Sequence, residues 1–369
     1  MRGFDCVSEL ARTYPTSGIR AMFDLAKDYP AAINTCNGEP NFETPEHIKE
    51  SGMRAIAEGM TKYGSEAGLD AMREAVANKY NREFGGHRYE LSDVMITVGG
   101  VEGILLCLLS VLNPGEEVII PDPTYTCYLG QTLALGGVPV RVPLYEEHGF
   151  RLQPEDLERA ITPKTKAVII SYPSNPLGAV LRAEDGERLA RVIEKHNIVI
   201  LSDEVYEKIV FDGRTHFSLA QIPRIRDKVL VVNSLSKTYA MTGWRIGYVV
   251  GTNAEIMRHM FKMQQAVVSC LPPFIMRAGA DAIDGPQDCV EEMRRHYERR
   301  RDLLVDGLRA IPGMKCFKTE GSFCTFINIK DYGNAGFGSR RPSDVARRGA
   351  HKGLRYRAKL GGTHDAHRR

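Results

Sequence analysis

Residues 233–248 read Asn-Ser-Leu-Ser-Lys-Thr-Tyr-Ala-Met-Thr-Gly-Trp-Arg-Ile-Gly-Tyr and follow a continuous apolar run, Val229–Val232. Such a run predicts a buried strand of a parallel sheet. Lys237 comes just after this strand, where partial loss of water favours its neutral, nucleophilic form. Ser234 and Arg245 supply a hydroxyl and a planar cation, which are both groups that bind phosphate. The stretch therefore predicts a lysine that forms a Schiff base with a phosphorylated aldehyde.

The pattern S-x-S-K-x-x-x-x-x-G-x-R-x-G in this stretch resembles the fold-type I pyridoxal-phosphate aminotransferases of the aspartate aminotransferase group. It is carried by Ser234, Ser236, Lys237, Gly243, Arg245 and Gly247. A pattern of this length is more specific than a lone glycine motif, although a surface lysine on a serine-rich loop is the simpler alternative. The resemblance implies pyridoxal 5′-phosphate as the cofactor, Lys237 as its Schiff-base residue, and a phosphate held by Ser234, Ser236 and Arg245.

Apolar runs alternate with amphipathic helical stretches from Val94 onward, which is typical of βαβ units and a parallel sheet. The runs are Val94–Val98, Glu117–Pro121, Val138–Val142, Ala167–Ser171, Ile198–Ser202 and Val229–Val232, followed by a short run at Gly247–Gly251. We therefore predict an α/β fold. The resemblance implies fold type I, with a mostly parallel seven-stranded large domain and a small α+β domain. Ligands bind beyond the carboxyl ends of such strands, so the residues just after each run are candidates for the site.

The first two runs are followed by groups suited to a flat, phosphorylated ring. Gly99, Gly100 and Val101 lead into a helix, whose N-terminal N–H groups and partial positive charge favour a phosphate. A dinucleotide fingerprint is not indicated, because G-x-G-x-x-G is absent. Tyr125 follows Asp122-Pro-Thr, and an aromatic side chain after a rigid turn can stack on a ring. The resemblance places the cofactor phosphate at the glycine turn and Tyr125 over the pyridine.

The fourth and fifth runs end in N-P-L-G, which contains Asn175, and in D-E-V-Y, which contains Asp203 and Tyr206. An aspartate at the end of an apolar strand is costly unless it has a cationic partner, and a protonated pyridine nitrogen is one. The resemblance implies that Asn175 and Tyr206 hydrogen-bond the ring oxygen. The alternatives are an ordinary turn for Asn175 and a helix N-cap for Asp203.

Two candidates precede the sheet. Gly38 lies in Asn-Gly-Glu-Pro, where a backbone can approach a ligand closely. The resemblance assigns Gly38, with Tyr125 and Asn175, to the substrate. It also implies a homodimer in which Tyr63 reaches the partner's cofactor phosphate. A plain turn and an ordinary loop aromatic are the alternatives. Thr44-Pro45-Glu46 predicts a helix start, with the threonine as the N-cap.

Composition limits the function classes. The 369 residues are 43% hydrophobic and 26% charged, as in a soluble globular protein. No window is apolar enough for a membrane span, and the first ten residues lack a secretory signal. Eight cysteines without a C-x-x-C pair make zinc or a disulfide framework improbable, so we expect no metal and a cytoplasmic location. We also expect no nucleic-acid or membrane partner.

We predict four segments: residues 1–40 as the N-terminal part of the small domain, 41–255 as the large cofactor-binding domain, 256–333 as the small domain, and 334–369 as an atypical basic tail. Alternation at 321–330 predicts a strand of the small domain. The tail holds ten Lys or Arg and two Asp or Glu, and it lacks the apolar content for a packed core.

The resemblance stops near Tyr332, so the family's carboxylate-binding arginine is not located, and Arg355 is not assigned that role. We take an alternate-frame C-terminus as a hypothesis for the tail. A basic arm that binds nucleic acid is disfavoured, because no stacking aromatics are interleaved with its charges.

The expected function is transfer of an amino group between an α-amino acid and an α-keto acid, with glutamate and 2-oxoglutarate as one pair. Lyase-type chemistry on the same fold, or a C-terminally altered member with little or no activity, are the alternatives. Aspartate, aromatic, alanine and branched-chain donors all remain open.

Overall fold

A computed structural model describes residues 6–14, 27–29, 31 and 38–332. Contacts divide the chain into two compact units: residues 1–304 with 317–326, and residues 305–316 with 327–369. The predicted basic tail lies outside the described residues, as does most of the predicted segment 1–40. In the part of the chain that is described, no helix is long and apolar enough to cross a membrane.

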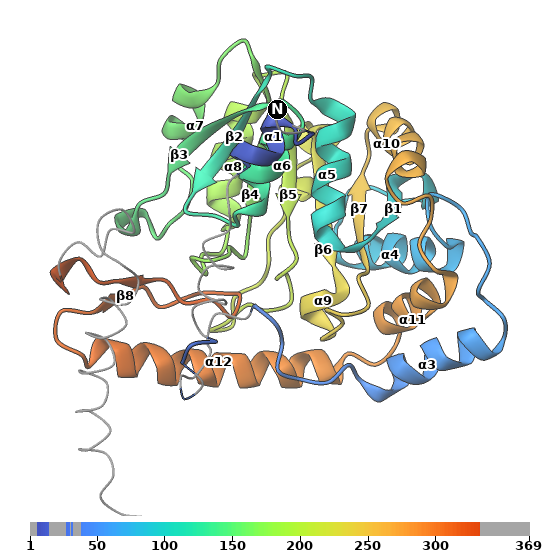
Figure 1. The fold of residues 1–369 in the computed structure, drawn as a ribbon. Helices are drawn as coiled ribbons and strands as arrows, with labels where there is room; N and C mark the ends of the chain where they lie inside the picture. Colours follow the sequence, from blue (N-terminus) through green and yellow to red (C-terminus); the bar gives the residue numbers. More distant parts are fainter. Residues whose placement is uncertain (1–5, 15–26, 30, 32–37, 333–369) are drawn as a thin grey trace, which may run out of the picture. The chain divides into compact units, whose positions relative to one another are not determined.

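A seven-stranded sheet forms the centre of the larger unit (Figure 1). Its strands are β1 (Val94–Thr97), β2 (Glu117–Asp122), β3 (Val138–Pro143), β4 (Thr165–Ser171), β5 (Val199–Asp203), β6 (Val229–Ser234) and β7 (Gly247–Gly251). Their order is β1-β7-β6-β5-β4-β2-β3. Only β7 runs antiparallel to its neighbours, and the other pairs are parallel. The mostly parallel, seven-stranded α/β prediction is therefore confirmed.

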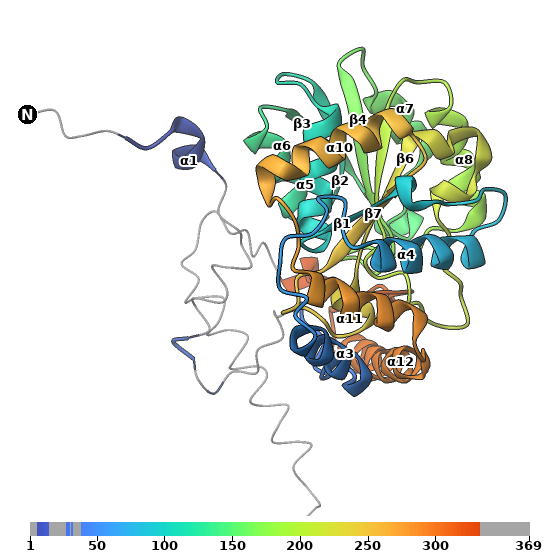
Figure 2. The same cartoon turned by 90° about the vertical axis from the view of Figure 1, so that its right-hand side faces the viewer.

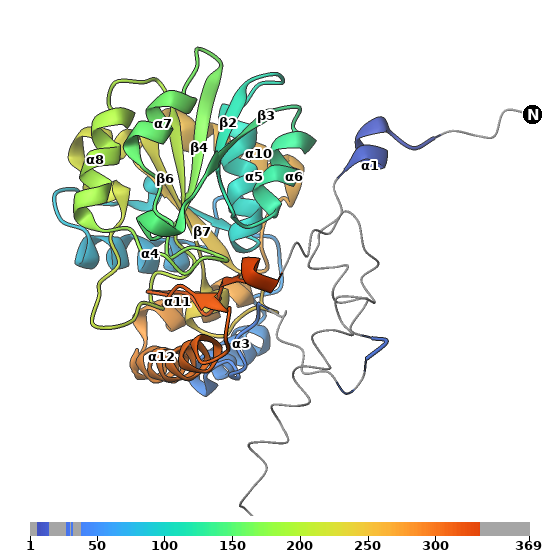
Figure 3. The ribbon, with the colours of Figure 1, turned by 90° about the vertical axis from the view of Figure 1, so that its left-hand side faces the viewer.

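Helices cover both faces of this sheet. The α-helices of the described residues are α1 (Glu9–Thr13), α3 (Glu46–Ala57), α4 (Asp70–Glu83), α5 (Gly99–Val111), α6 (Cys127–Ala134), α7 (Pro154–Ala160), α8 (Ala183–Ile193), α9 (Leu235–Thr238), α10 (Ala254–Val267), α11 (Pro273–Asp284) and α12 (Asp288–Arg309), of which α1 has no buried residue. Figures 2 and 3 show α5 and α6 on the opposite side of the strands from α4 and α8. The smaller unit contains an antiparallel pair, β8 (Lys315–Cys316) and β9 (Ile327–Asn328).

The strands are apolar throughout because both of their faces are buried. In β6, Val229 and Val231 belong to the core shared with α4 and α8, whereas Leu230 and Val232 belong to the core shared with α5 and α10. Each fully buried side chain of this kind contributes about 1.5–3 kcal/mol relative to exposure. The alternation fixes the register of β6, and with it the direction in which the chain leaves the sheet.

Two sequence predictions need correction. Helix α3 begins at Glu46 with Pro45 as its N-cap, because the Thr44 hydroxyl donates instead to the Ala240 carbonyl, at 2.7 Å. The predicted strand at 321–330 is regular only at Ile327–Asn328. Ser322 has a φ of 57°, which interrupts an extended strand, and its N–H donates to the carbonyl of Ile209 in a distant loop.

The sheet brings its functional ends together. Ser171, at the end of β4, pairs in register with Asp203 at the end of β5, and Asp203 pairs with Val232 of β6. The chain then passes from β6 directly into the short helix α9. The carboxyl ends of three adjacent parallel strands therefore present their following residues at one edge of the sheet.

Candidate active site

Lys237 lies on α9, the single helical turn that follows β6. Ser234 caps this turn by accepting a hydrogen bond from the Ser236 N–H, at 3.2 Å. The half-buried Lys237 ammonium donates to the Gly38 carbonyl, at 2.5 Å. Burial lowers the pKa of Lys237, and the Arg245 cation acts in the same direction. A larger fraction of this amine is therefore neutral and nucleophilic than for a lysine in water.

Asp203 is a buried carboxylate without a cationic hydrogen-bond partner among the described residues. Its oxygens accept from the Tyr128 hydroxyl at 2.6 Å and from the Val205 N–H at 3.2 Å. Burial raises the pKa of Asp203 to about 6, although these two hydrogen bonds act in the opposite direction. An ionised carboxyl in this position is stabilised by any cation that enters the site, such as a protonated ring nitrogen.

Asn175 and Tyr206 lie on the loops that follow β4 and β5. Tyr206 is 2% exposed and packs edge-on against Phe323, with ring centroids 5.3 Å apart. The thiol of Cys324 lies beside both polar side chains: its sulfur is 3.6 Å from Asn175 Oδ1, and after burial it is the next cause that raises the pKa of Tyr206. The two predicted ring-oxygen donors are thus brought together by a third residue.

The glycine turn after β1 is packed closely against β7. Gly99 has a φ of +72°, and α5 begins there. A Cβ on Gly247 would lie 2.6 Å from the Asn233 carbonyl oxygen and 2.7 Å from the Gly99 carbonyl carbon. The guanidinium of Arg245 reaches the same turn, where its Nη2 is 3.5 Å from the Val98 carbonyl. A helix N-terminus and an arginine therefore meet at one point, which suits an anion.

The remaining predicted phosphate ligands differ in their availability. The Ser234 hydroxyl bonds within the protein, to the Ile246 carbonyl at 3.0 Å and to Ser236 Oγ at 2.9 Å. Gly100 and Val101 lie in the first turn of α5, and the Val101 carbonyl accepts from the Gln131 amide at 2.8 Å. These contacts fix the turn but occupy Ser234, so Ser236 is the more available of the two hydroxyls.

Tyr125 is half-buried and stands edge-on to Tyr128, with ring centroids 5.6 Å apart. Tyr128 itself was not among the sequence candidates, although its hydroxyl contacts Asp203. The available signal was its spacing of three residues from Tyr125, since the turn between them, in which the Tyr128 N–H donates to the Tyr125 carbonyl at 3.3 Å, brings both rings together. Cys324 and the close approach of Gly247 were also missed, and Cys324 offered no signal because it is remote in sequence.

Not every predicted site residue gathers here. Tyr63 is 93% exposed and projects from the loop between α3 and α4. Gly38 contributes only its carbonyl, to Lys237, and a Cβ added there would meet nothing within 4 Å. In the single chain, the residues that cluster are those that follow the strands.

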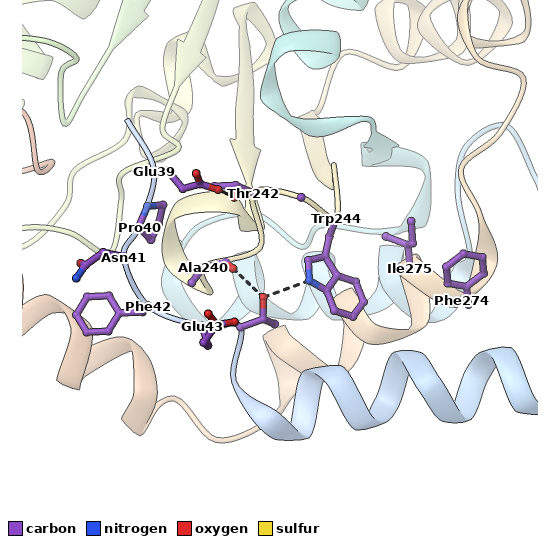
Figure 4. A pocket seen from close by; sticks show the side chains of 12 residues that line it. Glu39, Pro40, Asn41, Phe42, Glu43, Ala240, Thr242, Trp244, Phe274 and Ile275 are labelled. Carbon is purple, nitrogen blue, oxygen red and sulfur yellow. Dashed lines mark hydrogen bonds between the residues drawn. The ribbon is translucent and has the colours of Figure 1, made fainter. Parts of the chain in front are cut away.

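A pocket of about 640 Å³ adjoins the lysine loop (Figure 4). The segment Glu39–Thr44 lines one side, and Ala240, Thr242, Gly243 and Trp244 line another. Thr44 joins these walls, because its hydroxyl oxygen also accepts from the indole N–H of Trp244, at 3.2 Å. None of the predicted cofactor-binding side chains lines this pocket, so it neighbours the lysine site and does not coincide with it.

A second polar cluster contains side chains that can bind metals: Glu204, Glu207 and His216, whose ligand atoms lie within 4.8 Å of one another. Glu207 forms a 2.6 Å ion pair with the buried ammonium of Lys79. Glu204 accepts hydrogen bonds from Ser202 and Ser218. The position that a cation would take beside Glu207 is therefore filled by Lys79.

Comparisons with known proteins agree on one family. The family model described as "Aminotransferase class I and II" matches residues 30–346. An aromatic-amino-acid aminotransferase of Thermococcus litoralis is 42% identical over 86% of this chain and 82% of its own length. An aspartate aminotransferase of Pyrococcus abyssi is 40% identical over the same shares of the two chains.

Solved structures give the same result. The aspartate aminotransferase of Rhizobium meliloti superimposes with a TM-score of 0.85 at 38% identity, covering 89% of this chain and 82% of that one. The aspartate aminotransferase of Thermus thermophilus with maleate has a TM-score of 0.85 at 35% identity, covering 90% and 87%.

Proposed function

Because the chain belongs to the class I and II aminotransferases and transfers an amino group between an amino acid and a keto acid, we propose that pyridoxal 5′-phosphate is its cofactor and that Lys237 attaches it. The observation that carries this proposal is the meeting of three groups at one sheet edge. These are an amine with a lowered pKa, a buried carboxylate without a cationic hydrogen-bond partner among the described residues, and an arginine at a helix N-terminus.

The residues present fit this cofactor. Gly247 has no Cβ, so β7 packs directly against the glycine turn and fixes the N-terminus of α5 beside Arg245, where a phosphate would bind. Arg245 and Ser236 add a cation and a hydroxyl. Asp203 offers the negative charge that a protonated pyridine nitrogen requires.

When bound, the cofactor supplies an electron sink for the bond that breaks at the substrate's α-carbon. We assign the proton transfer at that carbon to Lys237, whose lowered pKa makes it a better base near neutral pH. Asp203 would keep the ring nitrogen protonated, and Tyr206 and Asn175 would donate to the ring oxygen. Tyr125 would exclude water from one side of the ring.

The phosphate is assigned to Gly99, Gly100, Val101, Ser234, Ser236, Arg245 and the partner's copy of Tyr63. Within this set, Ser234 acts mainly by capping α9, since its hydroxyl already bonds inside the protein. Gly38, Tyr125 and Asn175 are assigned to the substrate. Glutamate and 2-oxoglutarate are proposed as one amino donor and acceptor pair, by analogy with relatives named for aspartate and aromatic amino acids.

We further propose a homodimer, because Tyr63 is 93% exposed and the resemblance implies that a tyrosine at its position reaches the site of a second copy. The division into a large domain at 41–255 and a small domain at 1–40 and 256–333 belongs to the same proposal. A cytoplasmic location is supported by the cysteines of the described residues, which are free thiols.

The test is the absorption spectrum of the purified protein with pyridoxal 5′-phosphate, before and after addition of glutamate. We expect a visible band that depends on Lys237 and that disappears when glutamate donates its amino group. Lys237→Ala should abolish the band and reduce turnover by at least about a thousandfold. The matched control is Lys195→Ala, since Lys195 is 64% exposed.

Each outcome has a distinct meaning. A band that is present in the Lys195→Ala variant and absent in Lys237→Ala supports the assignment. A band that persists in Lys237→Ala would contradict it. A wild-type band that glutamate leaves unchanged would reject glutamate as the donor, and keto-acid production from aspartate or phenylalanine would then identify the substrate. Elimination products in place of amino transfer would favour lyase chemistry.

A further inference from the structure

Cys324 is the one thiol among the described residues that hydrogen-bonds a predicted ring-oxygen donor, Asn175. Its sulfur lies 3.6 Å from Asn175 Oδ1, within hydrogen-bonding reach for sulfur, whereas the hydrogen bonds of the described residues include none between Cys324 and Tyr206. The Lys237 ammonium lies 5.6 Å from the ring centroid of Phe323, the residue before it. Cys324 is therefore part of the site, although it is 121 residues after Asp203 in the chain.

The backbone that carries Cys324 is held from several sides. The N–H groups of Glu320 and Gly321 both donate to the Gly178 carbonyl, at 2.8 and 3.0 Å, in the loop that also holds Asn175. The Ser322 N–H donates to the Ile209 carbonyl at 2.9 Å, and the Ser322 hydroxyl accepts from the Cys324 N–H at 3.3 Å. The thiol is thus fixed relative to both loops that it bridges.

The protonation state of the thiol sets the direction of its hydrogen bond. Burial raises the pKa of Cys324, although hydrogen bonds from its neighbours act in the other direction. A protonated thiol has one proton to donate, and the oxygen of a planar amide accepts it whereas the NH₂ end cannot. The contact therefore holds the oxygen end of Asn175 toward Cys324 and leaves the NH₂ end free to donate elsewhere.

We propose that Cys324 is a positioning residue, whose thiol fixes the orientation of the Asn175 amide so that its NH₂ group faces the cofactor's ring oxygen. This inference rests on the proposed function, because it gives Asn175 a target. Without the thiol, the amide can turn over and present its oxygen, which repels a ring oxygen and removes a donor. Loss of one neutral hydrogen bond corresponds to roughly a fivefold loss of affinity.

The test compares Cys324→Ala, which has no donor, with Cys324→Ser, which retains one. The first readout is the affinity of the apoprotein for pyridoxal 5′-phosphate, measured by fluorescence titration. The second is the pH at which the visible band of the bound cofactor changes form. Donation to the ring oxygen favours its ionised form, so loss of the donor should raise this midpoint. Groups that also face Lys237, namely Glu39, Arg245 and Asp203, are unchanged in both variants.

We expect Cys324→Ala to bind the cofactor about fivefold more weakly and to raise the titration midpoint by roughly half a unit or more, with Cys324→Ser within about twofold of wild type. Cys289→Ala, which removes a thiol that contacts only the Pro286 carbonyl among the described hydrogen bonds, should change neither readout. In an Asn175→Ala background, Cys324→Ala should have no further effect, since the amide that it orients is gone.

Results that overturn the inference are distinct from those that overturn the function. If Cys324→Ala has the same visible band and the same titration midpoint as wild type, the role of Cys324 is rejected. It is also rejected if Cys324→Ala shifts the midpoint as much in the Asn175→Ala background as in the wild-type background. Both outcomes leave the proposed function intact. Failure of Cys324→Ser to rescue would mean that the residue acts by packing. Absence of a band in the wild-type protein would reject both.

Discussion

Asp203 lowers the stability of the folded apoprotein at the position where we propose that it pairs with a protonated ring nitrogen. Its carboxyl ends a buried strand and accepts two hydrogen bonds from uncharged donors. Its pKa is raised to about 6, above the value of about 3.9 expected in the unfolded chain. The folded apoprotein therefore binds a proton at this residue more tightly than the unfolded chain does, and its stability falls as pH rises through this range.

The first prediction concerns Asp203→Asn. Removal of the charge should lower turnover by at least about a hundredfold, because the ring nitrogen loses its anionic partner. The apoprotein should at the same time gain up to about 3 kcal/mol of stability at pH 7, since an amide cannot ionise. Urea unfolding with and without cofactor measures this difference.

The pH dependence provides the control. Below about pH 4 both chains are uncharged at this position, so the stability advantage of Asp203→Asn should vanish there. Equal stabilities of the two apoproteins at pH 7 would show that the buried carboxylate has a compensating partner.

The second prediction concerns Gly247. Its missing Cβ allows β7 to approach the backbone of Asn233 and Gly99, and neither contact can move aside as a flexible side chain can. Gly247→Ala should cost about 1–3 kcal/mol of stability and weaken cofactor binding, because the turn that is assigned to the phosphate must shift. Gly243→Ala is the matched control, since a Cβ there meets nothing within 4 Å and should change stability by less than about 0.5 kcal/mol.

At the scale of elements, helix α4 is connected to the loop after β5 by a buried ion pair. Lys79 lies 2.6 Å from Glu207 and donates to the Tyr248 hydroxyl of β7 at 3.2 Å. Burial alone would lower the pKa of Lys79, but Glu207 and its neighbours outweigh it, so this pKa is raised. Burial likewise opposes ionisation of Glu207, whose pKa is nevertheless lowered by Lys79.

The third prediction is that Lys79→Met destabilises the protein by about 3–5 kcal/mol, because Glu207 is left buried and unpaired. Adding Glu207→Gln should restore a large part of this loss, as measured by urea unfolding. Lys208→Met is the control: its ion pair with Glu83 is partly exposed and should be worth less than about 1 kcal/mol.

The sign of the pH effect follows from Glu207. Its stabilisation is fully present above its ordinary pKa of about 4.3 and is lost as pH falls through its lower value in the folded state. Wild-type protein should therefore lose stability in acid, and Lys79→Met should lack this contribution. If Lys79→Met lost as much stability in acid as wild-type protein does, the Lys79–Glu207 ion pair would not be the source of that loss.

The sequence was most informative about the strands of the sheet. All seven predicted strands are present, because a strand buried on both faces must be apolar along its length. Thr44 was assigned to the wrong role, since its bonds to Ala240 and Trp244 depend on residues nearly 200 positions away. Cys324 was missed for the same reason, because its contact with Asn175 is set by packing, whereas the spacing of Tyr128 from Tyr125 was a local signal that the prediction did not use.

At the scale of the whole molecule, the exposure of Tyr63 leads to the fourth prediction. If Tyr63 serves the site of a second copy, Lys237→Ala and Tyr63→Ala homodimers should each be impaired. A mixture of the two, after subunit exchange, should regain activity, because one site of each hybrid then has both Lys237 and a partner's tyrosine. Turnover and mass measurement of the mixed dimers test this.

The control for this experiment is a mixture of Lys237→Ala with Asp203→Asn. Both residues belong to the same chain's sheet edge, so each site of the hybrid lacks one of them and an exchange of subunits should restore no intact site. The double variant Lys237→Ala/Tyr63→Ala mixed with Tyr63→Ala should restore none. Recovery in that last mixture would contradict a role for Tyr63 across the interface.

Residues 317–326 belong to the larger unit, although they follow residues 305–316 of the smaller one, and this has a consequence for biosynthesis. Asp203 and Lys237 leave the ribosome well before Cys324, which follows Asp203 by about 120 residues, or roughly 6–24 s of translation. A nascent chain can thus complete its central sheet while the thiol beside Asn175 has yet to be made. We therefore expect full-affinity cofactor loading only after this late segment docks, so newly made protein should acquire its prosthetic group at the end of synthesis.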